Sequence, residues 1–414
     1  MMKRTNGFTL IELLIVIAIL AVFATVTVLV INPAELIRAR RDSTRLSDLN
    51  TINKTLGLLQ TDQPGASFGS SNKVYVSIPD TSATCVNLGL PALPSGWTYG
   101  CVTTANLYNV NGTGWIPVNL MSFSAGSPLS RLPVDPINAT STGNYYTYVT
   151  GGSWEFTAFP ESSKYKMGGG SDKTSGDGGP YPELFEIGSN LALHPVSRDT
   201  SLKGYWNFEE GSGATTYDSS GAGNVGTWNG SGSHWASGRV GTYGGQFNGT
   251  NDYLDVGNTS SLNITGNITF MAWVYLTSLP GTGQYRVINR GVDGGFGMYV
   301  GAGDHPDDIE CGIRTSNGGR AISSDGYASN ILNMWTHLAC VYDGSALRLY
   351  VNGSQIGSAS ASGENNVGGY NTSVRIGSDW LPGKFFPGRI DTVRIYDRGL
   401  SADEVRAIYE SANN

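Results

Sequence analysis

The chain has 414 residues, which is enough for two or three domains that each bury their own core. Charged residues make up only 14% of the sequence and glycine occurs 57 times, a composition that is typical of turn-rich β structure outside the cytoplasm. The formal net charge of −7 argues against a generic phosphate-binding surface, and we expect no nucleic-acid partner.

The N-terminus joins a short basic segment to a long apolar one. Residues 1–7 are polar and basic, and residues 8–31 form an apolar run with a single charge, Glu12. Its uncharged part, residues 13–31, has the 19 residues that a helix needs to cross a bilayer core. An ordinary secretory signal carries its cleavage site behind a shorter apolar stretch, whereas this polar-to-apolar junction precedes the run. Cleavage there would leave the whole helix on the mature protein.

The residues KRTNG/FTLIELLIVIAIL closely resemble the class III leader of type IV prepilins and type II secretion pseudopilins. In that family a prepilin peptidase in the membrane cuts after the glycine, here Gly7, and the new N-terminal residue, here Phe8, is N-methylated. The resemblance implies a single-pass protein of the inner (cytoplasmic) membrane that later enters an extracellular or periplasmic filament. Its implied partners are the peptidase and other pilin subunits.

Glu12 occupies the position of the family's glutamate at the fifth mature residue. A carboxylate in hydrocarbon is costly unless it has a partner. The resemblance implies that this partner is the free α-amine of Phe8 on a neighbouring subunit, so that the pair sets the stagger of the filament. The alternative is an interfacial glutamate that reaches the headgroups.

The apolar run is followed by Pro33, which predicts a kink between two helical segments. Residues 34–60 then carry apolar side chains at intervals of three and four, which predicts an amphipathic helix. We expect a solvated face for the four arginines just past the apolar run: Arg38, Arg40, Arg41 and Arg45.

Next we expect a small antiparallel sheet packed on this helix. Gly151-Gly152 separates two of its strands and is a hairpin signal. The stretch RLPVDPINATSTGNYYTYVTGGSWEFTAF resembles the C-terminal sheet of major pseudopilins, where an LPxDP turn precedes the last hairpin. Five runs have the composition of strands: 73–78, 84–88, 97–102, 145–150 and 153–159.

The four cysteines fall into one pair in each half of the chain: Cys85 with Cys101, and Cys311 with Cys340. An even count is compatible with two local disulfides in an oxidising compartment, and the alternative is four buried thiols.

Residues 168–190 are rich in glycine and include Asp172 and Asp177. Pseudopilins can carry a calcium site in such a loop, but this spacing matches no defined ligand loop, so we expect a flexible connector. Residues 191–200 are the expected linker to the next domain.

From residue 202 onward, aromatic and β-branched runs alternate with Gly, Asn and Asp turns, the pattern of a β-sandwich or jelly roll. The ending LSADEVRAIYE predicts a short helix with Ser401 as N-cap and Glu404 as its capping-box partner. We expect strands in seven runs: 268–276, 285–290, 295–300, 335–344, 347–353, 373–377 and 388–397.

The order of phrases from GYWNFEEGSGATTYDSSGAGNVGTW through ITFMAWVYL and WTHLACVYDGSALRLYVNG to FPGRIDTVRIYDRGLSADEV strongly resembles the laminin-G-like, concanavalin A-like jelly-roll family. The resemblance covers about residues 200–411. It implies the fold but leaves the function open, because this fold hosts lectins, adhesion modules, pentraxins and glycosidases.

We expect no enzyme. Retaining glycoside hydrolysis needs two carboxylates about 5 Å apart. The nearest arrangement is HPDDIEC, where Asp308 and Glu310 alternate and Asp307 points the other way, in an expected loop-rich acidic segment. No Ser-His-Asp order, zinc-ligand spacing or phosphate-cradling loop is evident in the sequence.

Calcium is the one cofactor that we consider. Asp391 shares a predicted strand face with Val393 and Ile395, so it is expected to point inward, where a carboxylate needs a partner. In several families of this fold the matching aspartate binds a structural calcium; the alternative is that Asp391 caps the backbone N–H groups of a loop.

Two further candidates lie on the expected surface. The first is an acidic cluster that either binds a surface calcium or is a solvated loop: Asp304, Asp307 and Asp308. The second is Trp380, which follows Asp379 and precedes Pro382 and is a candidate for stacking on a sugar.

Together these features predict a multidomain α+β and all-β chain, a minor type IV pilin-like subunit that displays a jelly roll to carbohydrates or cell-surface ligands. The alternatives are a type II secretion pseudopilin with a cargo-recognition domain and an envelope-tethered glycan-processing enzyme. The predicted parts are a leader (1–7), a transmembrane and polymerisation helix (8–31), a pilin-like α+β domain (32–190), a linker (191–200) and a jelly roll (201–414).

Overall fold

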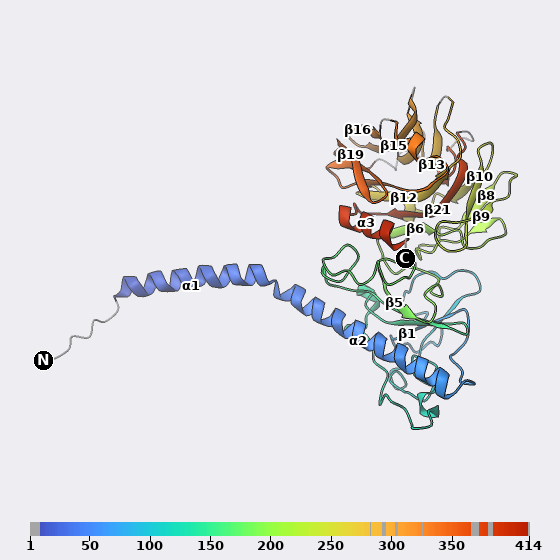
Figure 1. Cartoon of the computed structure of the whole chain (residues 1–414). Coiled ribbons are helices and arrows are strands. Elements are labelled where there is room, and N and C mark those ends of the chain that lie inside the picture. Colours follow the sequence, from blue (N-terminus) through green and yellow to red (C-terminus); the bar gives the residue numbers. More distant parts are fainter. Residues whose placement is uncertain are drawn as a thin grey trace.

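The structure, a computed structural model, describes residues 9–281, 283–291, 295–302, 305–324, 326–365, 372–379 and 384–412, and no side chains for residues 22–31 and 302. Figure 1 shows three parts in chain order: two consecutive long helices, a small α+β domain packed against the second helix, and a β-sandwich, which we call the sandwich.

The first helix stands apart from the body of the molecule (Figure 1). α1 (Leu10–Ile31) and α2 (Pro33–Asp62) meet at Asn32, whose backbone is left-handed with a φ of 43° and whose side chain accepts the N–H of Glu35 at 3.3 Å. Pro33 takes the first helical position, where a missing N–H costs nothing. The predicted break near Pro33 is therefore confirmed.

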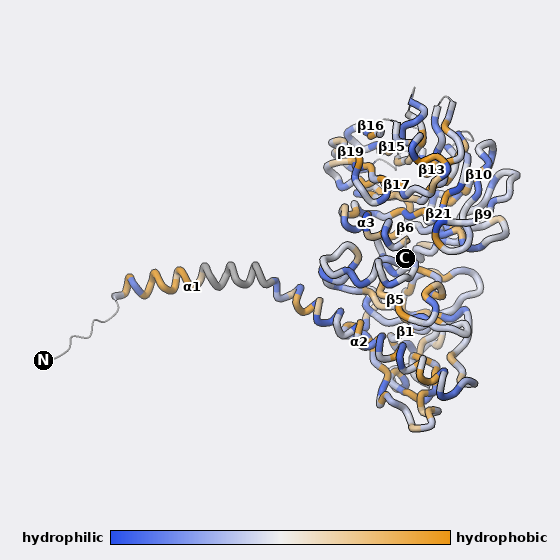
Figure 2. Tube along the Cα trace, viewed as in Figure 1, coloured by the Kyte–Doolittle hydropathy of each residue, from blue (hydrophilic) through white to orange (hydrophobic). Residues whose placement is uncertain are grey.

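The described N-terminal half of α1 is hydrophobic along its length (Figure 2). Its large side chains from Leu10 to Leu20 are exposed in the single chain. Among the side chains that the structure describes, no helix is both long and apolar enough to cross a membrane.

α2 packs against a five-stranded sheet with the order β2-β1-β3-β4-β5. Leu49, Ile52, Leu56 and Leu59 of α2 are buried at intervals of three and four, which confirms the amphipathic helix. β1 pairs with β2 in parallel, so the predicted antiparallel sheet is wrong for that pair. The strands are β1 (Lys73–Val76), β2 (Thr98–Gly100), β3 (Thr147–Thr150), β4 (Trp154–Ala158) and β5 (Phe185–Gly188).

Residues 84–88 form turns and not the predicted strand, because the backbone of Cys85 is left-handed, with a φ of 62°. Both disulfides form: Cys85 with Cys101 and Cys311 with Cys340. The second bond joins the two sheets of the sandwich through its core.

One of the four arginines, Arg45, lies inside the molecule and not on a solvated face. Its guanidinium contacts the carboxylate of Asp135, from the LPVDP turn, and those of Asp42 and Glu161 at 2.6–2.7 Å. Asp135 also accepts the N–H of Ile137 at 2.8 Å, so one carboxylate closes the turn and holds α2 on the sheet. Asp42 lies one turn away on the same helix, whereas only the tertiary fold brings Asp135 and Glu161 to Arg45.

The sandwich consists of two eight-stranded antiparallel sheets around one large core. We call the sheet that faces the α+β domain the inner sheet and the other the outer sheet. The inner sheet contains β6 (Leu202–Trp206), β9 (Trp235–Ser237), β10 (Tyr243–Asn248), β12 (Ile268–Leu276), β17 (Trp335–Tyr342), β18 (Ala346–Val351), β19 (Ser354–Ser360) and β21 (Pro387–Tyr396). The outer sheet contains β7 (Thr215–Thr216), β8 (Gly226–Asn229), β11 (Tyr253–Gly257), β13 (Tyr285–Arg290), β14 (Phe296–Ala302), β15 (His305–Thr315), β16 (Gly318–Ser324) and β20 (Val374–Ile376).

α3 (Ala402–Ser411) begins at Ser401, whose hydroxyl accepts the N–H of Glu404 while the Glu404 carboxylate accepts the N–H of Ser401. This capping box confirms the prediction for the end of the chain.

The α+β domain and the sandwich share a hydrophobic cluster, which we call the junction core. Met167, Tyr181 and Leu184 pack against the inner sheet and against Val405 and Ile408 of α3. The predicted flexible connector at 168–190 is therefore wrong, because this segment contributes buried side chains and β5.

Residues 191–200 run along this junction and are packed into it. The Arg198 side chain is buried and donates to the carbonyl of Tyr145 and, at 2.8 Å, to the hydroxyl of Thr157. The N–H of Ser197 donates to the carbonyl of Ser219 at 2.6 Å. The segment predicted as a linker is a strap that ties the sandwich to the α+β domain.

Candidate functional site

The N-terminal end of α1 carries a second capping box, which was not among the predictions from the sequence. The Glu12 carboxylate accepts the Thr9 N–H at 2.8 Å and its hydroxyl at 2.7 Å, while the Thr9 hydroxyl accepts the Glu12 N–H at 3.3 Å. The spacing Thr-x-x-Glu is the signal that would have revealed it. Gly7 and Phe8, the predicted processing residues, lie outside the described residues.

A groove of about 480 Å³ lies on the outer sheet. Core side chains of β15, such as Ile309 and Cys311, point into the sandwich, so Glu310 and Arg314 point the opposite way, away from the α+β domain. Its volume is in the range of about 300–1,000 Å³ that is usual for ligand pockets.

Tyr299 of β14 and Arg286 of β13 form the middle of this groove. The Arg286 guanidinium lies 3.8 Å from the centre of the Tyr299 ring and 3.3 Å from an Asp379 carboxylate oxygen. A side chain at Gly297 would meet the Tyr299 hydroxyl at 2.0 Å, so only glycine lets the ring lie along the sheet. The Tyr299 hydroxyl donates to Asn289 at 3.3 Å.

The described side chains of the groove are mixed in charge, with more cationic than acidic groups. Its acidic side chains are Glu310, which accepts a hydrogen bond from Gln284 at 3.1 Å, and Asp379. Burial raises the pKa of Glu310 above its ordinary value. The cationic side chains that face the groove are Arg286, Arg314, Arg320 and Lys384. Arg290 also borders the groove, but its buried guanidinium donates to the Leu262 carbonyl and to the side chains of Asn258 and Asn263.

The predicted acidic cluster is divided. Asp304 lies outside the described residues, and Asp307 and Asp308 belong to β15 and not to a loop. Asp308 is 2% exposed and accepts the N–H of Gly326 at 2.9 Å. Trp380 also lies outside the described residues, although its neighbours in sequence, Asp379 and Lys384, line the groove.

Asp391 is buried, but the predicted strand face is wrong. Thr392 has a φ of 44° and forms a β-bulge, so Val393 and Ile395 reach the core while Asp391 pairs with Trp273 on the opposite face. Without the bulge, side chains along β21 would have alternated regularly between the two faces of the sheet, as the prediction assumed.

The Asp391 carboxylate accepts the N–H groups of Arg239, Val240 and Thr392 at 2.7, 3.0 and 2.7 Å. These donors fit the loop-capping alternative. Burial raises the pKa of Asp391 to about 7. Within the described ranges no three His, Cys, Asp or Glu side chains lie close enough to hold a metal ion. Calcium at Asp391 stays a prediction.

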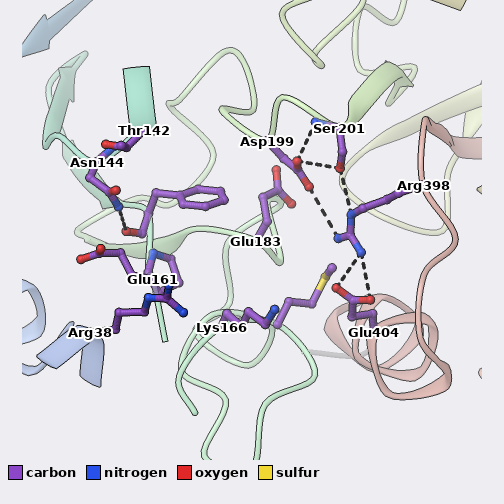
Figure 3. A pocket seen from close by; sticks show the side chains of 13 residues that line it. Arg38, Thr142, Asn144, Glu161, Lys166, Glu183, Asp199, Ser201, Arg398 and Glu404 are labelled. Carbon is purple, nitrogen blue, oxygen red and sulfur yellow. Dashed lines mark hydrogen bonds and ion pairs between the residues drawn. The ribbon is translucent and has the colours of Figure 1, made fainter. Parts of the chain in front are cut away.

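A second cavity, of about 520 Å³, lies at the junction of the two domains (Figure 3). The Arg398 side chain lies along one side of the cavity and contacts the carboxylates of Asp199 at 3.9 Å and Glu404 at 2.9 Å. Its Nε also donates to the Ser201 hydroxyl at 3.0 Å. Figure 3 shows Glu183 in the middle of the cavity wall. Because Arg398 pairs with Asp199 of residues 191–200 and with Glu404 of α3, this cavity fits a structural role.

Comparisons with known proteins bear first on the N-terminal half. Residues 2–28 match the family described as the prokaryotic N-terminal methylation motif. Over 123 residues the chain is 34% identical to the type IV wide pilus major component PilA4 of Thermus thermophilus, a stretch that covers 28% of this chain and 81% of that protein. The chain belongs to the type IV pilin family. This pilin is therefore of a kind that prepilin peptidase processes and that assembles from the membrane into an extracellular filament.

Residues 248–406 of this pilin match the family described as the concanavalin A-like lectin/glucanases superfamily. One similar solved structure is the binding domain of Paraclostridial Mosquitocidal Protein 1, at a TM-score of 0.43 and 20% identity, with 52% of this chain and 53% of that chain covered. Another is domain 4 of AbnA, a GH43 extracellular arabinanase from Geobacillus stearothermophilus in complex with arabinotriose, at 0.40 and 20%, with 50% and 98% covered. A third is the receptor binding domain of botulinum neurotoxin C/D mosaic serotype, at 0.39 and 14%, with 51% of each chain covered. The pilin spans about half the length of the two toxin chains.

The N-terminal motif could be identified from the sequence, whereas the groove could not. Tyr299, Arg286 and Lys384 come from separate strands and loops, so no local pattern connects them. The nearest signal was the alternation of Asp308 and Glu310, which does place Glu310 on the face that the groove occupies.

Proposed function

We propose that this pilin is a minor filament subunit that presents the sandwich as an adhesive, saccharide-binding module. The observation that supports this most is the position of the groove. The inner sheet packs against the α+β domain through the junction core, so the groove on the outer sheet points away from the part that joins the filament.

Bulk favours a sparse or terminal position in the filament. The sandwich accounts for about half of the chain and packs closely on the α+β domain (Figure 1). A module of this size on every subunit would crowd a helical polymer. A tip or an occasional position leaves room for it.

Binding without hydrolysis is the second part of the proposal. A retaining glycosidase presents two carboxyl groups about 5 Å apart to its substrate. Asp308 is buried and accepts a backbone N–H from Gly326, and Glu310 accepts a hydrogen bond from Gln284. These contacts favour a structural role for Asp308 and contact with the ligand for Glu310.

A glycan array probed with the full-length pilin in detergent tests the proposal. We expect retention on a subset of saccharides and loss of retention in Tyr299→Ala, which removes the ring that supports Arg286. Tyr243→Ala, an exposed tyrosine outside the groove, is the matched control. Uniform silence of the array would contradict the proposal. If the pilin released sugar from a polysaccharide, and Asp308→Asn and Glu310→Gln abolished that release, the result would support the tethered enzyme. Co-purification with secreted proteins would support the pseudopilin.

A further inference from the structure

We propose that the groove on the outer sheet binds an anionic saccharide, a chain that carries carboxylate or sulfate groups. This inference rests on the proposed saccharide binding and specifies its ligand class. It starts from a contrast of charge: among the described residues, four cationic and two acidic side chains face the groove, on a chain whose formal net charge is −7.

The cations are placed on both sides of the groove. Arg314 of β15 and Arg320 of β16 lie on one wall, and Lys384 lies on the other, beside Asp379. Arg320 is exposed, and the Lys384 side chain is 45% exposed, so both reach solvent. Arginine forks pair with planar carboxylates and with sulfate-like anions through two hydrogen bonds at once.

The remaining lining groups suit sugar hydroxyls. Gln284 and Glu310 offer an amide and a carboxylate side by side, which together can donate to and accept from hydroxyl groups. Gly312 and Gly319 carry no side chain, which keeps the floor open between β15 and β16. A phosphate backbone favours an uninterrupted cationic track, whereas here Glu310 and Asp379 interrupt it. The lining therefore favours an acidic saccharide over a nucleic acid.

Gly319 allows a charge change inside the groove without disturbing the fold. It lies in β16 directly opposite Arg314, and a Cβ built there has nothing within 4 Å. Gly319→Glu would place a negative charge beside Arg314, and Gly319→Gln would add the same bulk without charge. Gly266→Glu makes the same charge change at an open glycine that does not line the groove.

The test measures binding of the full-length pilin in detergent to two matched pairs of polymers: polygalacturonate with its methyl ester, and dextran sulfate with dextran. We expect binding to at least one anionic member, no binding to its neutral partner, and weakening as salt rises, because salt screens exposed charges. Which pair responds distinguishes carboxylate from sulfate as the recognised group. Gly319→Glu should weaken binding at least about tenfold, equivalent to about 1.4 kcal/mol, whereas Gly319→Gln and Gly266→Glu should retain it.

Equal binding of neutral and anionic partners would overturn the anionic ligand while leaving saccharide binding in place. Binding to double-stranded DNA but to none of the polymers would overturn it in favour of a nucleic acid. Silence with these polymers and across the glycan array would overturn both proposals. Equal weakening by Gly319→Gln and Gly319→Glu would show that bulk and not charge is responsible, and would also overturn the inference.

Discussion

Arg45 of α2 donates two hydrogen bonds to Asp135 of the LPVDP turn: Nε lies 2.6 Å from one carboxylate oxygen and Nη2 lies 2.9 Å from the other. Both side chains are almost completely buried. The pair connects α2, which follows α1, to the rest of the α+β domain, on which the sandwich packs. It therefore links the N-terminal helices to the sandwich.

Removing the charge of Asp135 should therefore loosen the whole α+β domain. We expect Asp135→Asn to lower the free energy of unfolding by about 1.5–3 kcal/mol, because the buried Arg45 loses its bidentate partner but keeps the carboxylates of Asp42 and Glu161. Arg40→Gln, on the exposed face of the same helix, should change it by less than about 0.5 kcal/mol. Urea unfolding of the chain from Pro33 onward measures both, and equal stability of the two variants would contradict the role of the pair.

The α+β domain and the sandwich should unfold as one unit. Leu184 is completely buried in the junction core, and a Leu→Ala change at such a site costs about 2–5 kcal/mol. We expect Leu184→Ala to lower the protection of backbone amides from hydrogen exchange in both domains. Loss of protection in the α+β domain alone, or two separate thermal transitions in the unmodified protein, would show that the domains are independent.

Two buried carboxyl groups beneath the strap should make stability depend on pH. Glu155 accepts the N–H groups of Leu193 and His194 at 2.8 Å, and Glu186 accepts that of Tyr181 at 2.9 Å. Burial is the largest cause that raises the pKa of each carboxyl group. The nearby charge of Glu155 raises the pKa of Glu186 further.

Since these folded-state pKa values lie above those of the unfolded chain, the folded state holds protons that the unfolded chain releases. This stabilising contribution is complete below about pH 4.5 and is lost as pH rises toward the folded-state pKa, about 8 for Glu155. Glu186→Gln, which keeps a hydrogen-bond donor for Glu155, should flatten the decline in unfolding free energy between pH 5 and about pH 8. An unchanged pH profile in this variant would contradict the assignment.

The Cys311–Cys340 disulfide connects β15 of the outer sheet with β17 of the inner sheet. The double variant Cys311→Ala with Cys340→Ala should lose about 2–5 kcal/mol of stability. Thermal unfolding measures the loss. Reductant should lower the unfolding temperature of the unmodified protein as well, whereas the variant has no Cys311–Cys340 bond to lose. A variant as stable as the unmodified protein would show that the bond is not needed.

Local patterns predicted much of the fold. The aromatic and β-branched run at 268–276 predicted β12, and Ser401 with Glu404 predicted the start of α3. The failures arose where distant contacts decide: Arg45 is buried because carboxylates from three segments meet it. Thr392 interrupts the alternation of β21 through a bulge that the residue types do not signal.

The candidate sites divide in the same way. The processing motif and Glu12 are contiguous in sequence and could be identified by resemblance, whereas the groove collects side chains from β13 to the segment after β20. The strap at 191–200 looked like a linker because burial of polar residues such as Arg198 depends on the partner surface.

The central claim, that this pilin enters filaments through α1, depends on the charge of Glu12. The capping box with Thr9 makes Glu12→Ala ambiguous, because it removes the helix cap together with the charge. Glu12→Gln separates the two, since glutamine also serves at this position of a capping box.

The decisive measurement is the amount of subunit, cleaved after Gly7, in filaments sheared from cells that express the unmodified pilin or Glu12→Gln. The account predicts that Glu12→Gln is cleaved normally but is depleted from filaments by at least about tenfold, as expected if an uncompensated loss of about 1.4 kcal/mol or more falls on each subunit contact. Normal incorporation of Glu12→Gln would contradict it.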